Sequence, residues 1–496
     1  MYIPLSDFPL ISLIFIVLTS ASLLVWLFPD KQQAKWVALI AMSVALVFSI
    51  MMVAAFDSQN ANFQFIEKHS WISTINVFYH VGVDGISLLF LPLTLLIGIA
   101  SLVASWTKVS NMPRLFYTLL LLLETATIGV FSSLDTILFF MFWEMTLFPL
   151  FFLISFWGVE PARRLAAVRY ILFMMAGGVA LLFAFVLLAL DHAEHQGHLV
   201  FDLVTLMENP VATELQIVVF FLLFLGFAPK IPVFPLHTWL PSIAMEGPMA
   251  VSALLTGLKL GAFGLIRFLI PLTPDAALKF HWLLAGIGVT GIIYGAILAY
   301  AQTNIRQMLA YASISHVGLV VLGIASLNLQ GIQGSVFQLI NFVIVSGGLF
   351  LLVGFLHHRT GTTDILGLGG VVNTMPLLTG FVLFLGLASL ALPGTSGFPA
   401  EFLIIVSALD VHTGAGFAVI ITMVLSAAYF LTIYRKIFLG KATSIVVIHA
   451  VDLKGRELAV AVIMSSMVVV LGSFPSLIID LISQSTEAWA GLVSHP

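Results

Sequence analysis

Residues 228–237 read Ala-Pro-Lys-Ile-Pro-Val-Phe-Pro-Leu-His, and residues 392–401 read Leu-Pro-Gly-Thr-Ser-Gly-Phe-Pro-Ala-Glu. Each stretch interrupts a long apolar segment. Proline lacks a backbone donor and clashes with the preceding helical turn, so three prolines within 229–235 exclude one continuous helix. The second stretch repeats the first at an offset of 164 residues, with matched pairs Pro229 and Pro393, Phe234-Pro235 and Phe398-Pro399, and His237 and Glu401.

A discontinuous helix in each half is typical of transporters built from inverted repeats. With five helices per half, the repeats are helices four to eight and nine to thirteen, and the odd number gives the halves opposite topologies. The unwound turns need water or ionisable side chains to satisfy their backbone groups, so they mark a hydrated interior. The alternative is that Pro and Gly only kink packed helices.

The composition predicts an all-α polytopic membrane protein. Of 496 residues, 60% are hydrophobic and only 8% are charged, which excludes an ordinary soluble protein. A transmembrane β-barrel would alternate apolar and polar positions instead. About 14 spans are expected, near 9–28, 35–55, 85–106, 115–132, 135–157, 168–190, 214–231, 248–270, 281–301, 307–325, 333–356, 376–392, 413–434 and 458–482.

These spans divide the chain into four parts. They are three N-terminal helices with an extracytoplasmic loop (1–112), a first repeat (113–270), a second repeat (281–440) and a last loop and helix (441–496).

Alternate loops differ sharply in basic residues, which collect on the cytoplasmic side. One set holds only Lys68 and Lys279, and one of its loops, 191–214, gathers acids without a basic partner. The split predicts an even helix count with both termini outside the cytoplasm. The other set contains Lys31, Lys35, Lys108, Arg114, Arg163, Arg164, Arg169, Arg306, Arg359, Arg435, Lys436, Lys441, Lys454 and Arg456.

Several chemistries are excluded. The chain has no cysteine, so disulfides, thiolate metal sites and Cys-ligated iron–sulfur clusters are absent, and a net charge of −4 indicates no nucleic-acid partner. There is no phosphate loop, nucleotide fingerprint or His-carboxylate cluster at metal-ligand spacing. We therefore expect no cofactor and no metal in this chain.

Lys230 is expected in the first break, with Glu144 on helix five as its partner. Burial disfavours a charged lysine and a carboxylate favours it, so a carboxylate that approaches and recedes makes the lysine take up and release a proton. The alternative is a static ion pair that orients the helices.

Four further embedded groups suit a relay. Lys259 lies within helix eight, His316 lies on helix ten, and Glu401 follows the second break. Glu124, on an otherwise apolar helix, either joins a lateral relay or pairs statically. The alternatives are a static pair for Lys259, a packing role for His316 and a helix cap for Glu401.

Three remaining charges near span ends are expected to extend to the membrane surface: Arg267, Asp480 and Glu487.

Together these residues resemble the antiporter-like membrane subunits of respiratory complex I, among them the M-type chains. The likeness covers nearly the whole chain and is shared in part with Mrp-type cation/proton antiporters and membrane-bound hydrogenases. The matching stretches are 79–88, Phe142-Trp143-Glu144, 229–241, Leu258-Lys259, 301–306, 313–318 and 392–402.

The resemblance implies a fourteen-helix fold with two inverted five-helix repeats and a proton route along the membrane midplane. It implies a coupled pair of Glu144 and Lys230, central relay sites at Lys259 and His316, and a distal acid at Glu401. Glu124 and His237 are weaker candidates.

The resemblance also implies the setting of the chain. Flavin, iron–sulfur clusters and quinone belong to partner subunits, whose quinone reduction drives the chain. The partners are other antiporter-like and small membrane subunits, peripheral redox subunits and the lipid bilayer, in an energy-transducing membrane such as a bacterial inner membrane.

Two positions depart from the family pattern. Ser242-Ile243-Ala244 stands where Asp-Ala-His is usual, and Gln338 is followed by Asn341 and Phe342 where many M-type chains have a histidine. Water or Asn341 would then have to bridge the interior. Alternative functions are a cation/proton antiporter, an ion-coupled module for inorganic-carbon uptake, and a structural spacer whose relay has decayed.

Overall fold

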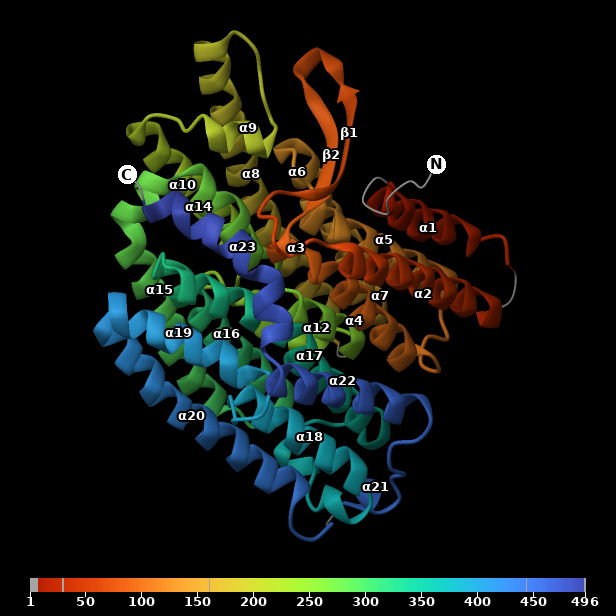
Figure 1. Ribbon diagram of the computed structural model, residues 1–496. Coiled ribbons are helices and arrows are strands. Elements are labelled where there is room, and N and C mark those ends of the chain that lie inside the picture. The colour runs from red at the N-terminus through yellow and green to blue at the C-terminus, as the bar shows by residue number, and fades with distance from the viewer. Residues whose placement is uncertain (1–7, 29–30, 160, 443, 495–496) are drawn as a thin grey trace.

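The computed structural model describes residues 8–28, 31–159, 161–442 and 444–494. Within them, eleven helices are long and apolar enough to cross a membrane, and three shorter apolar helices complete the set. These fourteen helical segments correspond one for one to the predicted spans. The predicted all-α polytopic fold is confirmed (Figure 1).

The N-terminal part contains a β hairpin that the sequence analysis treated only as a loop. Its strands pair in antiparallel fashion, and the turn includes Asn76 in a left-handed conformation with φ of 55°. The sequence contained a signal for this hairpin, because two runs with several aromatic and β-branched residues, 64–72 and 77–83, flank Asn76. This part consists of α1 (Leu10–Leu24), α2 (Lys31–Ala55), β1 (Gln64–Ile72), β2 (Val77–Val83), α3 (Gly85–Leu88) and α4 (Phe90–Ser105).

The first group of helical segments covers the first predicted repeat, and some of its five predicted spans are divided into shorter helices. It includes the first break, where no helix forms between Phe227 and Trp239. The break lies where the three prolines predicted it. The elements are α5 (Pro113–Ser132), α6 (Thr136–Met145), α7 (Leu147–Trp157), α8 (Arg163–Gln196), α9 (Leu203–Glu208), α10 (Thr213–Phe227), α11 (Trp239–Glu246), α12 (Met249–Gly257), α13 (Leu260–Gly264), a π-helical turn (Leu265–Leu269) and α14 (Ile270–Leu272).

The second group follows the first at the same offset of about 164 residues. Its long helix α17 corresponds to α8, and its break, between Ser389 and Gly397, separates α18 from α19 as the first break separates α10 from α11. The elements are α15 (Pro274–Ala301), α16 (Ile305–Ala325), α17 (Leu329–Thr360), α18 (Pro376–Ser389), α19 (Gly397–Val411) and α20 (Thr413–Phe438).

The C-terminal part corrects the predicted last span of 458–482. The helix α22 (Arg456–Ser473) ends before Pro475, and a separate helix α23 (Ser476–Ser494) begins after it; α21 (Ile445–Ile448) precedes both. In Figure 1, α23 crosses the front of the bundle toward the C-terminus. Trp489 donates a hydrogen bond to the carbonyl of Ile266, at 2.8 Å. Proline at the junction ends the helix because it cannot continue the hydrogen-bond ladder.

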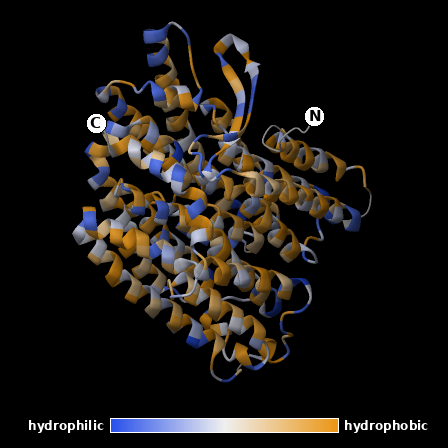
Figure 2. Ribbon diagram, viewed as in Figure 1, coloured by the Kyte–Doolittle hydropathy of each residue, from blue (hydrophilic) through white to orange (hydrophobic). Residues whose placement is uncertain are grey.

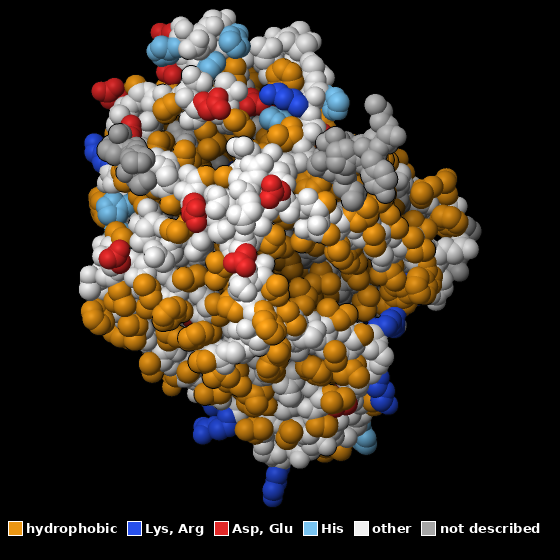
Figure 3. Space-filling model, viewed as in Figure 1, with side chains coloured by type: hydrophobic (Ala, Val, Ile, Leu, Met, Phe, Trp, Pro, Cys, Tyr) orange, Lys and Arg blue, Asp and Glu red, His pale blue; other side chains and the backbone are white. Residues whose placement is uncertain are grey.

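Helices α16 and α17 lie at the centre of the bundle, because 89% and 94% of the residues in their apolar stretches are buried. Hydrophobic residues run through the helices of the whole bundle (Figure 2), and they form the middle band of the visible surface (Figure 3). Most Lys and Arg on that face lie at its lower end, and most Asp, Glu and His lie at its upper end. This separation follows the predicted orientation, with the basic side cytoplasmic.

The hairpin is anchored on the acidic side by Asp202. Its carboxylate lies 2.8 Å from Lys68 Nζ and 2.7 Å from His80 Nδ1, and it caps α9 at the backbone N–H of Thr205. Burial alone would raise the pKa of Asp202, but the hydrogen bonds from His80 and Lys68 hold it well below its usual range. The expectation that this acidic loop has no basic partner is therefore wrong for Asp202.

A second carboxylate docks the hairpin on α6. Asp135 accepts from the backbone N–H of Phe78 in β2 and from the N–H groups of Ile137 and Leu138 in the first turn of α6. Burial raises the pKa of Asp135 to about 6, although these backbone hydrogen bonds act against the shift. The hairpin thus helps to position the helix that carries Glu144.

Candidate functional site

The first break holds Lys230 inside the protein. Its ammonium donates to Thr146 Oγ1 at 2.8 Å and to the carbonyl of Trp143 at 3.2 Å, and Nζ lies 3.8 Å from the centre of the Trp143 ring. The unwound backbone is itself satisfied in part by Trp239, whose Nε1 donates to the carbonyl of Pro229 at 2.9 Å. The buried ammonium is therefore held by acceptors and an aromatic face from α6 and its C-cap.

Glu144 neighbours these acceptors on α6 but makes no ion pair with Lys230 within the described part of the chain. Its Oε1 is buried without a hydrogen-bond partner. On α8, Gly178 leaves the space that this carboxyl group occupies, since a Cβ there would collide with it. The static ion pair considered from the sequence is therefore not formed: no oxygen of Glu144 lies within 4.0 Å of Lys230 Nζ.

Lys259 lies at a second irregularity that the sequence analysis did not predict. Helix α12 ends at Gly257 and α13 begins at Leu260, so Lys259 occupies the joint and not the interior of a helix. Its ammonium donates to Ser313 Oγ on α16 at 2.7 Å. The Phe342 ring, whose centre is 5.7 Å from Nζ, covers it from α17.

His316 and Glu401 are brought together from α16 and α19. The His316 Nδ1 lies 3.3 Å from Glu401 Oε1, while its Nε2 is buried without a hydrogen-bond partner. A cavity of about 20 Å³ lies beside both side chains and is also lined by the hydroxyls of Ser389, Thr422 and Ser426. That volume holds about one water molecule.

An amide and hydroxyl chain continues from Glu401. Gln338 Nε2 lies 3.4 Å from Glu401 Oε1, Asn341 Nδ2 donates to Gln338 Oε1 at 3.3 Å, and Ser396 donates to Asn341 Oδ1 at 2.7 Å. Asn341 therefore links Gln338 to Ser396. The Phe342 ring lies near both Lys259 and His316: its centre is 5.7 Å from Lys259 Nζ and 6.3 Å from the centre of the His316 ring.

The two weaker candidates differ in their surroundings. Glu124 on α5 is buried, its Oε2 has no hydrogen-bond partner, and Gly98 on α4 leaves room for its carboxyl group. His237, in the first break, lies 3.2 Å from the hydroxyl of Tyr294, and its Nδ1 is buried without a partner. Neither shares a hydrogen bond with the other five within the described residues.

Arg267 corrects the expectation that it extends to the membrane surface. Its guanidinium is buried and forms a two-pronged ion pair with Asp84, with Nη1 2.9 Å from Oδ2. Asp84 also caps α3 at Ser87, so the ion pair joins the end of β2 to the π-helical turn that contains Arg267. Asp480 and Glu487 are both exposed on α23.

Three polar residues of the site were missed or only partly recognised from the sequence. Thr146 lies two residues after Glu144, Ser313 lies three residues before His316, and Ser396 lies within the quoted break. Spacing of three or four on a helix places residues on one face, which was the available signal for Ser313. The described residues contain no group of three or more His, Cys, Asp or Glu that could hold a metal ion.

Comparison with known proteins shows the family of the chain. The family model described as "NADH:quinone oxidoreductase/Mrp antiporter, TM" matches residues 133–426. These include both breaks and the five residues Glu144, Lys230, Lys259, His316 and Glu401. The chain belongs to this family. The resemblance drawn from the sequence motifs is confirmed, and the chain is a multi-pass integral membrane protein.

Relatives of this antiporter-like chain align over almost its full length. "NADH-quinone oxidoreductase subunit M" of Rickettsia bellii is 35% identical over 484 residues, covering 97% of this chain and 96% of the relative. "NAD(P)H-quinone oxidoreductase chain 4 3" of Trichormus variabilis is 38% identical, covering 96% and 90%. A chain of respiratory complex I from Thermus thermophilus has a TM-score of 0.88 at 29% identity, covering 97% of this chain and 99% of that one.

Proposed function

We propose that this chain is a proton-translocating membrane subunit of an NADH:quinone oxidoreductase of the complex I type. The observation that carries the proposal is the row of embedded ionisable side chains, each supplied by a helix break, a helix joint or a facing helix: Glu144, Lys230, Lys259, His316 and Glu401. Quinone reduction in partner subunits drives proton movement along this row. Full-length relatives that are named as subunits of such enzymes support the assignment.

The first step is a change in the distance between Glu144 and Lys230. The ammonium is held by Thr146 and Trp143, and the carboxylate has an unpartnered oxygen. Bringing opposite charges to 4 Å gains about 4 kcal/mol at an effective dielectric constant of about 20. That energy changes the equilibrium constant for proton binding by the lysine about 10³-fold, since each 1.4 kcal/mol is a factor of ten.

The second half of the row carries the proton from Lys259 toward Glu401. Ser313 accepts from Lys259 and lies one helical turn from His316, which contacts Glu401. Gln338 and Asn341 cannot carry a net proton, so they hold Glu401 in place. A water molecule in the cavity beside His316 and Glu401 completes the transfer, because its hydroxyl lining can orient it.

The two predicted repeats, 113–270 and 281–440, form the two halves of this route; helices α15 to α20 (Pro274–Phe438) make up the second. Each half contributes one broken helix, and the joint at Lys259 closes the first half. Flavin, iron–sulfur clusters and quinone reside in partner subunits, as do the other antiporter-like chains against which this one packs. The host membrane is the bacterial inner membrane.

A second candidate function is a subunit of a cation/proton antiporter. The family model covers Mrp antiporters as well as NADH:quinone oxidoreductases, and the row of ionisable groups suits both. An antiporter needs no electron donor. The same membranes therefore separate the two functions by whether proton movement depends on NADH or on Na⁺.

The test uses inside-out membrane vesicles that contain the variant chain in its assembly. Lys230→Ala and Glu144→Ala are expected to lower NADH-driven proton uptake and NADH:quinone reductase activity while the partners still co-purify. Lys436→Ala and Glu208→Ala are matched controls, because both residues are exposed and lie outside the row. Normal pumping in both test variants refutes the relay. Proton movement driven by Na⁺ without NADH assigns the antiporter function instead.

A further inference from the structure

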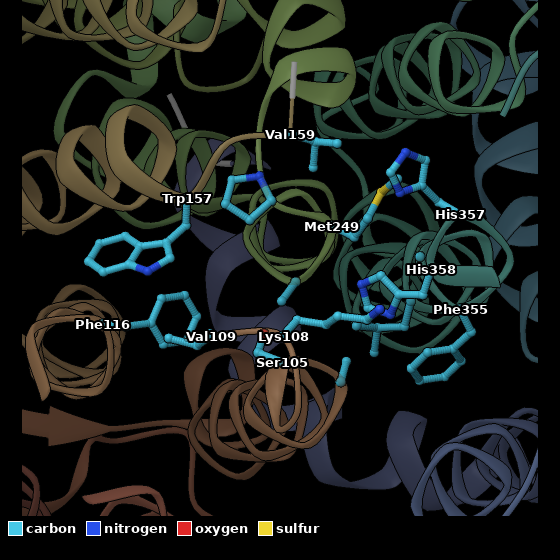
Figure 4. Close-up of a pocket in the computed structure, with 15 residues that line it drawn as sticks. Ser105, Lys108, Val109, Phe116, Trp157, Val159, Met249, Phe355, His357 and His358 are labelled. Carbon is cyan, nitrogen blue, oxygen red and sulfur yellow. The ribbon is translucent and has the colours of Figure 1, made fainter. Parts of the chain in front are cut away.

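A cavity of about 360 Å³ lies on the basic side of the protein, separate from the row of relay residues (Figure 4). It opens among the C-terminal ends of α4, α7 and α17 and the N-terminal ends of α5 and α12. Because Lys and Arg collect in the loops on this side, the cavity faces the cytoplasmic leaflet.

Three basic side chains face this cavity. They are Lys108 after α4, and His357 and His358 at the end of α17. In Figure 4 the Lys108 side chain extends toward the His358 ring. No acidic residue is found among the described residues that line the cavity, and no hydrogen bond or ion pair joins these three side chains to another described residue. Their donors are therefore free for a ligand.

Two arginines nearby differ from these three residues because their side chains already donate hydrogen bonds to backbone carbonyls. Arg163 donates to the carbonyl of Gly158 at 2.8 Å, and Arg306 donates to the carbonyl of Gly247 at 2.8 Å. The N-terminal turn of α12, at Met249, faces the same cavity and contributes the positive end of a helix. The cavity thus combines Lys and His donors with a helix N-terminus, a combination that favours an anion such as phosphate.

The rest of the lining is apolar. Trp157, Phe116, Leu351 and Phe355 form walls beside the basic end, and Trp157 is fixed by a hydrogen bond to the carbonyl of Asn111, at 2.9 Å. Gly354 leaves space against Met249. Inorganic phosphate has no apolar part that could contact these side chains, whereas a phospholipid carries both a phosphate group and apolar acyl chains. Basic pockets between membrane helices on the cytoplasmic side are suited to anionic lipid headgroups.

We propose that this cavity binds the phosphate group of an anionic phospholipid, with the headgroup at Lys108, His357 and His358 and the apolar part against Trp157 and Phe355. The site is independent of the proposed relay. A soluble phosphate shares the headgroup chemistry, and the experiment below separates the two sources.

The experiment measures binding of phosphatidylglycerol and phosphatidylcholine to the full-length chain in detergent by native mass spectrometry. The test variant is Lys108→Gln/His357→Gln/His358→Gln. Loss of the Lys108 ammonium and of two imidazole N–H donors is expected to weaken phosphatidylglycerol binding at least about tenfold and to leave phosphatidylcholine binding unchanged. The control Lys436→Gln/Lys441→Gln/Lys454→Gln removes three exposed charges from the same side. It is expected to bind like the wild type.

A second variant keeps the charges and fills the space. Ala104→Trp places a large ring among the lining residues and is expected to reduce phosphatidylglycerol binding as well. Equal binding of both lipids by the wild type, or equal losses in test and control variants, overturns the proposal. Displacement of phosphatidylglycerol by millimolar inorganic phosphate would retain the phosphate site and overturn the lipid assignment.

Discussion

His316 and Glu401 offer a direct test of whether the relay acts as one unit. With 3.3 Å between Nδ1 and Oε1, the Coulomb energy of the charged pair is about 5 kcal/mol at an effective dielectric constant of about 20, and about 1 kcal/mol at that of water. The interaction energy between them should therefore fall between about 1 and 5 kcal/mol. His316→Gln and Glu401→Gln remove charge while keeping hydrogen-bonding groups of similar size.

The assay is NADH-driven proton uptake by inside-out vesicles that carry each single variant and the double variant. Each single substitution is expected to slow uptake by at least about tenfold, which corresponds to about 1.4 kcal/mol. Because both groups serve the same transfer, the double variant should be no slower than the slower single variant. The control His449→Gln, an exposed histidine on the basic side, should combine with Glu401→Gln multiplicatively and have little effect alone. Multiplicative losses for His316 and Glu401 would refute their action as a pair.

Three further predictions concern stability and the carboxylates. Arg267→Met leaves the buried Asp84 charge unpaired and should lower the free energy of unfolding by about 3–5 kcal/mol, whereas Arg267→Met/Asp84→Asn should lose less; equal losses in chemical denaturation would contradict this. Asp202→Asn keeps the cap of α9 but loses the ion pairs, so it should cost about 1–3 kcal/mol at pH 7. Since the folded-state pKa lies below the unfolded value of about 3.9, that stability is fully present above about pH 4 and is lost as pH falls through the folded pKa; a difference between wild type and variant that does not shrink between pH 4 and pH 2 would argue against it. Gly98→Ala forces the Glu124 carboxyl group to move and should cost about 1–3 kcal/mol in thermal unfolding, and if Glu124 belongs to the route it should also slow proton uptake as Glu124→Gln does.

The helix irregularities show where local sequence rules were sufficient. Prolines in 229–235 and 393–399 determine both breaks, because a missing donor and a steric clash act wherever the helix is placed. The joint at Lys259 was not predicted. Its neighbours Gly257 and Gly261 permit a break without requiring one, and the packing of α12 and α13 against other helices decides it.

The β hairpin and α23 show the limits of length and hydropathy. Strands 64–72 and 77–83 are too short and too polar to be predicted as membrane spans. A prediction based on the length of apolar stretches therefore gives a loop there. The predicted last span merged α22 with the beginning of α23 because both are apolar. Only Pro475 marked their boundary.

The sequence by itself determined the membrane class, the approximate positions of the apolar helices and both breaks, and the identity of the ionisable residues. Those properties follow from the cost of placing polar groups in lipid, which acts residue by residue along the chain. Tertiary structure alone decided the partners: Arg267 and Asp84 are 183 residues apart, Lys259 and Ser313 are 54 apart, and Lys230 binds Thr146 while Glu144 stays unpaired. Hydrogen bonds act over about 3 Å, so they depend on which helix faces meet, and side-chain facing across distant helices is not encoded in local periodicity.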